Sequence, residues 1–194
     1  MRSLVYYIAT SVDGFIADQE GDTAAFPVHP DTLTALFDRY PETCPAHVRD
    51  ALGVTASPRR FDTVIMGAHT YAPAVAAGLP DGAYPHLRQI VVTHQAIDTQ
   101  AVDTMSGDVA AQVRHLKHEA GQDIWLCGGS DLATQLADEI DEIQVKINPV
   151  VFGTGIPLFA TGAGPRSLDC TDVTTLPSGV VLVTYRAGGD TPGD

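Results

Sequence analysis

Basic residues are scarce in this chain of 194 amino acids. Lys and Arg together number 11, against 24 Asp and Glu, and the formal net charge at pH 7 is −13. A surface of that charge repels nucleic-acid phosphates and anionic lipid headgroups over most of its area, so general binding to nucleic acid or to a membrane is excluded. We therefore expect a small-molecule ligand, and any anionic group on it must be held locally.

Cysteine is rarer still, with three residues that are far apart and include no Cys-x-x-Cys pair. This pattern indicates neither a disulfide framework nor a zinc site. His115 and His118 have a spacing that a metal could use, but Lys117 and Glu119 beside them are typical of a solvated helix face. We expect no bound metal.

Long apolar runs are absent as well. No stretch approaches the roughly 20 residues that a helix needs to cross a bilayer. The first three residues lead directly into an apolar run at 4–9, which is typical of a strand and not of a signal peptide. With 44% hydrophobic and 18% charged residues, the composition is that of a soluble globular protein. We expect a cytoplasmic protein with a single domain over residues 1–187 and a flexible tail over 188–194.

What the chain does contain is an alternation of strand-like and helix-like segments. The expected strands are residues 4–10, 62–66, 89–93 and 124–127, with a second extended piece after the turn at Asp13-Gly14. The expected helices are residues 30–37, a short helix that starts at 69–71, the stretch between Ser106 and Gly121, and residues 132–140. Strands that alternate with helices predict a buried parallel sheet.

Other segments depart from this alternation. Residues 38–60 contain several prolines and predict loops with a short helix around 46–52, and Pro73 is expected to break the helix that starts before it. Residues 168–176 and 180–186 flank a Pro-Ser-Gly turn and predict an antiparallel hairpin. The fold class that we expect is α/β: a mixed sheet, mostly parallel, with an antiparallel C-terminal hairpin.

A glycine turn stands at the most informative place in this pattern. Residues 127–131, with the sequence Cys-Gly-Gly-Ser-Asp, follow a predicted strand and precede a predicted helix. Glycines let the backbone approach a ligand closely, and the free N–H groups of a helix start favour an anion such as a pyrophosphate. A plain tight turn is the alternative. Residues 13–14, 67–70 and 93–94 follow the other strands at the same edge, where open α/β sheets bind ligands, so together these loops predict a cleft for a phosphate-bearing molecule.

Four stretches of the chain resemble one family of enzymes. Residues 66–71 (Met-Gly-Ala-His-Thr-Tyr) resemble the Met-Gly-Arg-x-Thr-aromatic element of dihydrofolate reductases, and residues 8–17 resemble the opening of the related riboflavin-biosynthesis reductase domain. Residues 126–130 are similar to the glycine turn that both share, and residues 148–159 resemble the Pro-Val-x-x-Gly-x-Gly-x-Pro-Leu-Phe element of the riboflavin branch. The resemblance implies a dihydrofolate-reductase-like fold with helices on both faces of the sheet.

The same resemblance implies a reductase that uses a nicotinamide dinucleotide, usually NADPH. Ala9 and Ile16 would line the nicotinamide pocket, and Cys127 would lie near the cofactor as a small strand residue. The positions that would face the phosphates or the adenosine ribose are Gly67, Ala68, His69, Thr70, Thr93, His94, Gly128, Gly129 and Ser130.

The chain departs from the family pattern at Ala68, where an Arg is common. An Arg there would be the natural bidentate partner of the 2′-phosphate, so its absence leaves the choice between NADPH and NADH open. His94, or Arg59 and Arg60 before the strand at 62–66, could substitute for it. We expect a modest preference for NADPH.

Two carboxylates are candidates for the substrate side of the reaction. Asp13 lies in the turn beside the expected nicotinamide pocket, although fixing the Asp-Gly turn is an equally good role for it. Asp31 stands where folate reductases place a substrate-binding carboxylate, although N-capping the helix at 30–37 is the more ordinary role. The resemblance favours a ribosylaminopyrimidine phosphate of the riboflavin pathway as substrate, and dihydrofolate reduction or non-catalytic NADPH binding stay open. It also implies a homodimer.

Overall fold

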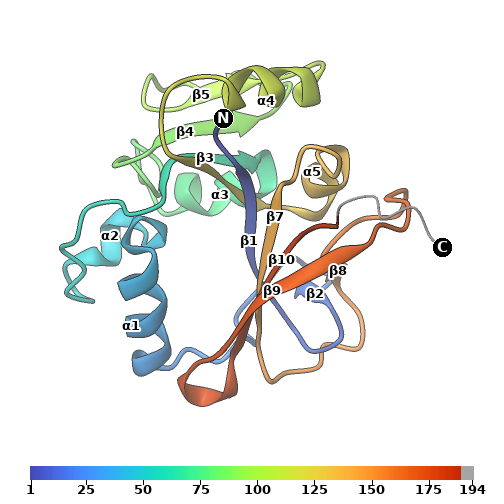
Figure 1. Cartoon of the computed structure of the whole chain (residues 1–194). Coiled ribbons are helices and arrows are strands. Elements are labelled where there is room, and N and C mark those ends of the chain that lie inside the picture. Colours follow the sequence, from blue (N-terminus) through green and yellow to red (C-terminus); the bar gives the residue numbers. More distant parts are fainter. Residues whose placement is uncertain (189–194) are drawn as a thin grey trace.

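Eight strands form one twisted sheet in the computed structural model, which describes residues 1–188 (Figure 1). Their order across the sheet is β5-β4-β3-β6-β1-β7-β10-β9. In chain order the strands are β1 (Leu4–Thr10), β3 (Phe61–Gly67), β4 (Arg88–Val92), β5 (Asp103–Met105), β6 (Asp123–Gly128), β7 (Glu142–Ile147), β9 (Leu168–Thr175) and β10 (Val181–Ala187).

The direction of the strands follows the sequence prediction. From β5 to β7 every neighbouring pair is parallel. Strand β10 then runs antiparallel to both β7 and β9, as the C-terminal hairpin requires. The expected α/β class, mostly parallel with an antiparallel hairpin, is confirmed.

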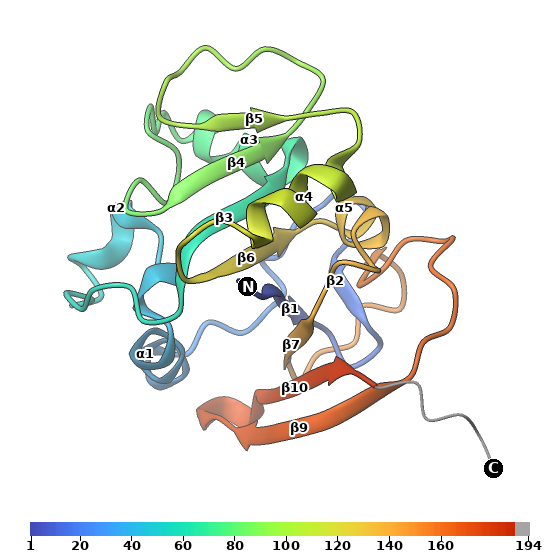
Figure 2. The same ribbon diagram turned by 45° about the horizontal axis from the view of Figure 1, so that its top comes forward.

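Helices cover both faces of the sheet (Figure 2). They are α1 (Pro30–Arg39), α2 (Ala46–Arg49), α3 (Ala68–Ala76), α4 (Val109–Lys117) and α5 (Ser130–Gln135), with short 3₁₀ turns η1 (Pro41–Thr43) and η2 (Pro177–Gly179). Because side chains alternate along a strand, Leu4 and Tyr6 of β1 pack with α4 and α5, whereas Val5 and Tyr7 pack with α3 and with Tyr40 after α1. We call the second side the Tyr7 face.

A second, two-stranded sheet closes the loops that follow β1 and β7. Strand β2 (Phe15–Ala17) pairs antiparallel with β8 (Ile156–Pro157). The approach is close: a Cβ atom added to Gly155 would lie 2.2 Å from the carbonyl oxygen of Ala17. Glycine is therefore required at position 155 for the two loops to meet.

Two predictions about helices are wrong. Helix α1 is capped by His29, which makes no side-chain capping bond, and not by Asp31. The reason is Pro30, whose fixed φ suits the first helical position, so the helix begins at Pro30 and Asp31 lies inside its first turn. Helix α3 continues through Pro73 to Ala76, and the proline removes the hydrogen bond that a backbone N–H at this position would donate to the carbonyl of His69.

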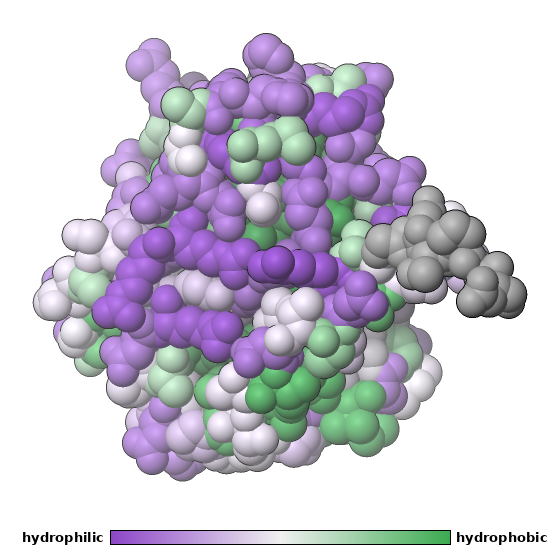
Figure 3. Space-filling view, in the orientation of Figure 1, coloured by the Kyte–Doolittle hydropathy of each residue, from purple (hydrophilic) through white to green (hydrophobic). Residues whose placement is uncertain are grey.

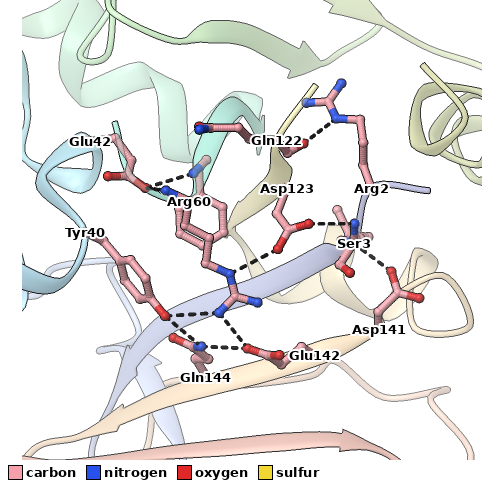
Figure 4. Close-up of polar contacts among 12 residues, drawn as sticks. Arg2, Ser3, Tyr40, Glu42, Arg60, Gln122, Asp123, Asp141, Glu142 and Gln144 are labelled. Carbon is pink, nitrogen blue, oxygen red and sulfur yellow. Dashed lines mark hydrogen bonds and ion pairs between the residues drawn. The ribbon is translucent and has the colours of Figure 1, made fainter. Parts of the chain in front are cut away.

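A polar network crosses the Tyr7 face at its amino end (Figure 4). The guanidinium of Arg60 donates to Asp123 at 3.1 Å, to the Tyr40 hydroxyl at 3.0 Å and to Glu142 at 2.9 Å. The amide of Gln144 donates to Glu142 at 2.6 Å and to Tyr40 at 3.1 Å. The network joins the segment after α1 to strands β3, β6 and β7.

The segment at 38–60 has a buried anchor of its own in Glu42, which is fully inaccessible to solvent. Its carboxylate accepts the backbone N–H groups of Arg59, Arg60 and Phe61 at 3.1, 2.8 and 2.8 Å. Three N–H donors balance the cost of burying one negative charge. This irregular segment is thereby tied to the start of β3.

Candidate functional site

Two of the predicted loops meet at the carboxyl edge of the sheet. A Cβ atom built on Gly67 would lie 4.0 Å from the carbonyl oxygen of Gly128 and 4.0 Å from the amide nitrogen of Gly129. The backbone before α3 therefore runs directly beside the backbone before α5. Gly128 has φ +133°, a conformation that side chains strongly disfavour, so glycine is required there.

Thr70 reaches over this glycine turn from the first part of α3. Its hydroxyl oxygen lies 3.9 Å and 3.8 Å from Cβ atoms built on Gly128 and Gly129. Ile8 of β1 closes the other side, with its Cδ1 atom 3.6 Å from a Cβ built on Gly128. Ile8 of β1 and Thr70, which follows β3, thus both lie close to the glycine turn at the end of β6.

The hydroxyl of Ser130, at the start of α5, is buried and has no hydrogen-bond partner among residues 1–188. A buried hydroxyl without a partner is costly and uncommon in native proteins. Beside a turn made of glycine and at the N-terminus of a helix, it is well suited to an anionic ligand atom. These features together fit the pyrophosphate of a dinucleotide.

The remaining cofactor positions lie along the same edge. Ala9 and Ile16 are half-buried at the end of β1 and on β2. Thr93 and His94 directly follow β4, which pairs with β3 up to Gly67 opposite Val92. His94, like Ala68 and His69, is exposed.

Arg59 and Arg60 cannot take the place of an arginine at position 68. They stand at the amino end of β3, which by its length is about 20 Å from its carboxyl end. Arg60 is held by the network of Figure 4, and the guanidinium of Arg59 donates to the carbonyl of Asp38. The expectation that either could hold a 2′-phosphate is therefore wrong, and His94 is left as the candidate.

Asp13 is engaged in holding the loop after β7. Its carboxylate accepts the N–H groups of Phe152 at 3.1 Å and Gly153 at 2.7 Å. The Ser11 hydroxyl and these two N–H groups lower the pKa of Asp13 below its usual value. A carboxylate with this environment stays ionised at neutral pH, which favours the turn-fixing role over proton donation.

Asp31 is exposed on the first turn of α1, and its neighbour Thr32 is the residue of that turn that faces inward. The Thr32 hydroxyl lies 2.8 Å from the hydroxyl of Ser178 and also contacts the carbonyl of Pro177. The inward-facing side chain of this turn is thus a threonine that holds the hairpin turn, and not a carboxylate. The catalytic role of Asp31 stays a prediction without structural support.

Apolar side chains are exposed at the end of the molecule where β1 and β7 finish. Val12, Val28 and Val151 are 63%, 78% and 67% exposed, and Phe26 stacks on Phe152 with ring centroids 5.1 Å apart. Figure 3 shows hydrophobic residues gathered toward this lower end, below a band of hydrophilic residues. An apolar patch on the same edge of the sheet as the polar groups around Gly128 and Ser130 is typical of a ligand-binding surface.

Two surface grooves lie elsewhere. One, of about 510 Å³, runs between β4, β5 and α4, and the other, of about 400 Å³, lies between α1 and residues 51–56. Neither includes any predicted cofactor residue. Within residues 1–188 no cluster of His, Cys, Asp and Glu could hold a metal ion, and no helix has the length and apolar character to span a membrane.

Comparison with known proteins agrees with this geometry. Residues 2–182 match the model of the RibD C-terminal domain family. The chain belongs to this family.

Two proteins from Bacillus subtilis (strain 168) are similar to this chain. The uncharacterized protein YyaP is 27% identical over 203 residues, which cover 97% of this chain and 96% of YyaP. The uncharacterized protein YwjB is 32% identical over 162 residues, which cover 81% of this chain and 83% of YwjB.

Solved structures show the same fold. A diaminohydroxyphosphoribosylaminopyrimidine deaminase/5-amino-6-(5-phosphoribosylamino)uracil reductase from Thermotoga maritima has a TM-score of 0.63 at 18% identity, covering 96% of this chain and 57% of that one. Dihydrofolate reductase from Enterococcus faecalis, complexed with NADP(H), has a TM-score of 0.63 at 14% identity, covering 96% and 97%. The dihydrofolate-reductase-like fold that the sequence implied is confirmed.

One residue beside the candidate site is not among those that the sequence pattern predicts. Lys146 of β7 lies opposite Ala9 of β1 on the Tyr7 face, half-buried, with Nζ 3.9 Å from the centroid of the Tyr7 ring. Burial lowers the pKa of Lys146 to about 8, and the nearby Cys127 thiol acts in the opposite direction. Burial also raises the pKa of Cys127 to about 12, so that thiol stays protonated.

Proposed function

We propose that this protein is a reductase that transfers hydride from a nicotinamide dinucleotide, preferably NADPH, to a small heterocyclic substrate. The observation that carries the proposal is the cradle formed by Gly67, the turn at Gly128-Gly129 and the unpartnered hydroxyl of Ser130. Membership of the RibD C-terminal domain family supports it independently.

Each part of the cradle has a distinct task. Backbone N–H groups at the start of α5 and the Ser130 and Thr70 hydroxyls would hold the pyrophosphate. Ala9 and Ile16, both half-buried, would flank the nicotinamide ring. When bound, that ring supplies the hydride; the protein orients it and keeps water away.

The preference between the two dinucleotides depends on the 2′-phosphate. Ala68 is exposed and offers no positive charge, and Arg59 and Arg60 are held at the far end of β3. His94 follows β4 at this edge, and an imidazole ring cannot give a phosphate the bidentate contact that a guanidinium gives. We therefore infer that NADPH binds less than about a thousandfold more tightly than NADH, a difference of roughly 4 kcal/mol.

We infer further that the substrate belongs to the class reduced in the riboflavin pathway, for which 5-amino-6-(5-phosphoribosylamino)uracil is the natural first compound to test. Support comes from the family and from the substrate that the Thermotoga maritima protein's name specifies. Dihydrofolate is the second candidate. The exposed position of Asp31 argues against it, because a pterin-directed carboxylate must face inward.

A homodimer is part of the same proposal. Strand β9 is the outermost strand of the sheet, and almost all of its residues are exposed. An edge strand of this kind offers unpaired N–H and C=O groups to a second copy. Analytical ultracentrifugation at micromolar concentration distinguishes a dimer from a monomer.

The direct test is titration of the protein with NADPH and NADH, followed by the fluorescence of its single tryptophan. We expect saturable binding of both, weakened about tenfold by Ser130→Ala, because a hydrogen bond to a charged group is lost. Ser106→Ala, an exposed serine near the start of α4, is the matched control and leaves binding unchanged.

Turnover is then measured as NADPH oxidation with the phosphoribosylaminouracil and with dihydrofolate. If neither dinucleotide binds saturably, the proposed function is wrong. If both bind but no substrate of either class oxidises NADPH, the protein is a nucleotide-binding module and not a reductase.

A further inference from the structure

Lys146 differs from every other Lys and Arg of the chain, all of which lie within residues 1–188. Each of the others donates a hydrogen bond or forms an ion pair, for example Lys117 with Asp141 at 2.7 Å. Within residues 1–188 the ammonium of Lys146 has no such acceptor; its contact is with the face of the Tyr7 ring, 3.9 Å from the centroid. A half-buried cation in this state is available to a ligand.

The register of the sheet places this cation next to the expected nicotinamide pocket. Lys146 pairs with Ala9 of β1 on one side and with Leu182 of β10 on the other. Ala9 is a residue that we propose to line the nicotinamide pocket. The ammonium and the reacting end of the cofactor would thus belong to adjacent strands.

The row of residues immediately beneath Lys146 is polar and incompletely paired. Tyr7, Gln144 and Thr184 lie side by side on β1, β7 and β10. The Tyr7 hydroxyl, Gln144 Oε1 and Thr184 Oγ1 are all buried without a hydrogen-bond partner in the described part of the chain. Buried polar atoms without a hydrogen-bond partner are uncommon in native proteins. Three of them on neighbouring strands indicate a place where a bound molecule can supply the missing hydrogen bonds.

Within the part of the chain that the structure describes, no carboxylate forms an ion pair with Lys146. On the same face, Glu142 pairs with Val5, four residues before Ala9, and is bonded to Arg60 and Arg186. Asp172 of β9, opposite Thr184, forms an ion pair with Arg39 of α1 at 3.5 Å. Asp31 is exposed on α1 and Asp13 is bonded to the loop after β7. The groups that do face Lys146 are the aromatic ring of Tyr7 from β1 and the protonated thiol of Cys127 from β6.

From this arrangement we propose that Lys146 is a substrate-contacting residue that selects heterocycles presenting an oxygen acceptor or an anionic group. An ammonium has donors only, so it pairs with ring carbonyls of the uracil type or with a carboxylate. It repels a protonated ring that bears amino groups and no carbonyl, such as 2,4-diaminopyrimidine. The inference rests on the proposed function, and it identifies the substrate class of that same site.

The test uses two ring probes of opposite character, orotate (uracil-6-carboxylate) and 2,4-diaminopyrimidine, titrated calorimetrically into the full chain with and without saturating NADPH. We expect orotate to bind the wild type. Lys146→Met keeps the aliphatic stem and removes the charge, and it should weaken orotate binding about tenfold or more. Lys146→Arg restores the charge and should stay within about threefold of the wild type. Thermal unfolding of both variants verifies that they are folded.

The pH profile provides a readout that a structural role would not move. Because the ammonium is lost as pH rises through its pKa of about 8, orotate affinity of the wild type should fall between pH 7 and pH 9. The Lys146→Arg variant should not show this fall, since arginine stays charged. NADPH affinity should be the same in all three proteins.

Three results overturn the inference: no saturable binding of orotate to the wild type, equal binding by Lys146→Met, or tighter binding of 2,4-diaminopyrimidine than of orotate. Each can occur while NADPH still binds, which leaves the proposed function standing. Loss of NADPH binding in the wild type, with orotate binding still dependent on Lys146, would instead overturn the proposed function alone.

Discussion

Replacing Arg60 by Met tests how much the network of Figure 4 stabilises the fold. The side chain of Arg60 is 22% exposed, and that of its partner Glu142 is only 5% exposed. Without the guanidinium, the carboxylate of Glu142 stays buried, with the amide of Gln144 and the more exposed Arg186 as its remaining partners. The variant therefore leaves a poorly balanced charge inside the protein.

Removing one partner of a buried ion pair costs about 3–5 kcal/mol. Since Gln144 and Arg186 remain, we expect the lower end, about 3 kcal/mol in the free energy of unfolding. For a chain of this length that loss lowers Tm by roughly 6–12 °C.

The effect should depend on pH with a definite sign. Burial alone would raise the pKa of Glu142, but Arg60, Gln144 and Arg186 together bring it below its usual value of 4.5. A carboxylate with a lowered pKa contributes stability above its unfolded-state pKa, and this contribution is lost as pH falls through the folded-state pKa. The gap between the wild type and Arg60→Met should be widest at neutral pH and narrow below about 4.5.

The assay is urea unfolding at pH 7, 5.5 and 4, with Arg88→Met as the matched control. Arg88 also bridges two carboxylates, Asp103 at 2.8 Å and Glu119 at 3.0 Å, but its side chain is 47% exposed. Exposed pairs contribute at most about 1 kcal/mol. An Arg60→Met loss no larger than that of Arg88→Met, or a gap that is the same at pH 7 and pH 4, would refute the reasoning.

Three further outcomes are expected. Gly128→Ala should destabilise the fold by about 1–3 kcal/mol and weaken NADPH binding, because φ is +133° there. Urea unfolding and cofactor titration measure the two effects. Gly164→Ala, where a Cβ meets nothing within 4 Å, is the control and should change neither stability nor binding. Asp13→Asn removes the charged acceptor of two N–H groups in the loop after β7. Limited proteolysis should therefore cut within residues 149–155 faster in the variant than in the wild type. Equal or slower cleavage would count against the turn-fixing role of Asp13. Reductive methylation with ¹³C-formaldehyde labels two lysines and the N-terminus, and NMR should show the Lys146 signal titrating near pH 8; a midpoint near 10.5 would contradict its burial.

Much of the fold could be predicted because its signals are local. The apolar runs at 62–66 and 124–127 are long enough to specify buried strands, and the helices between them make a parallel arrangement the natural outcome. Strand β5 was missed because Asp103–Met105 has no apolar run; Met105 is its one buried residue. The glycine turn was found for the same reason that the strands were, since a turn and a helix start are encoded by adjacent residues.

The site residues that were misjudged depend on chain direction and on distant segments. Arg59 and Arg60 precede a strand, whereas cofactors bind where parallel strands end, so these two residues are at the wrong edge. Lys146 lies in a stretch that alternates apolar and polar residues. Alternation shows which side chains share a face, but not that Tyr7, 139 positions earlier, packs against the amine. Burial of a polar face is a long-range property, and no local pattern reveals it.

The pairing of β2 with β8 couples the two loops that border the candidate site. The loops after β1 and β7 are joined by strand pairing, by the carboxylate of Asp13 and by the close approach of Gly155 to Ala17. A displacement of one loop must therefore carry the other with it, so Ile16 and the apolar rim around Phe152 shift as one body. Binding of the proposed cofactor beside Ile16 would therefore also restrain the loop that carries Phe152.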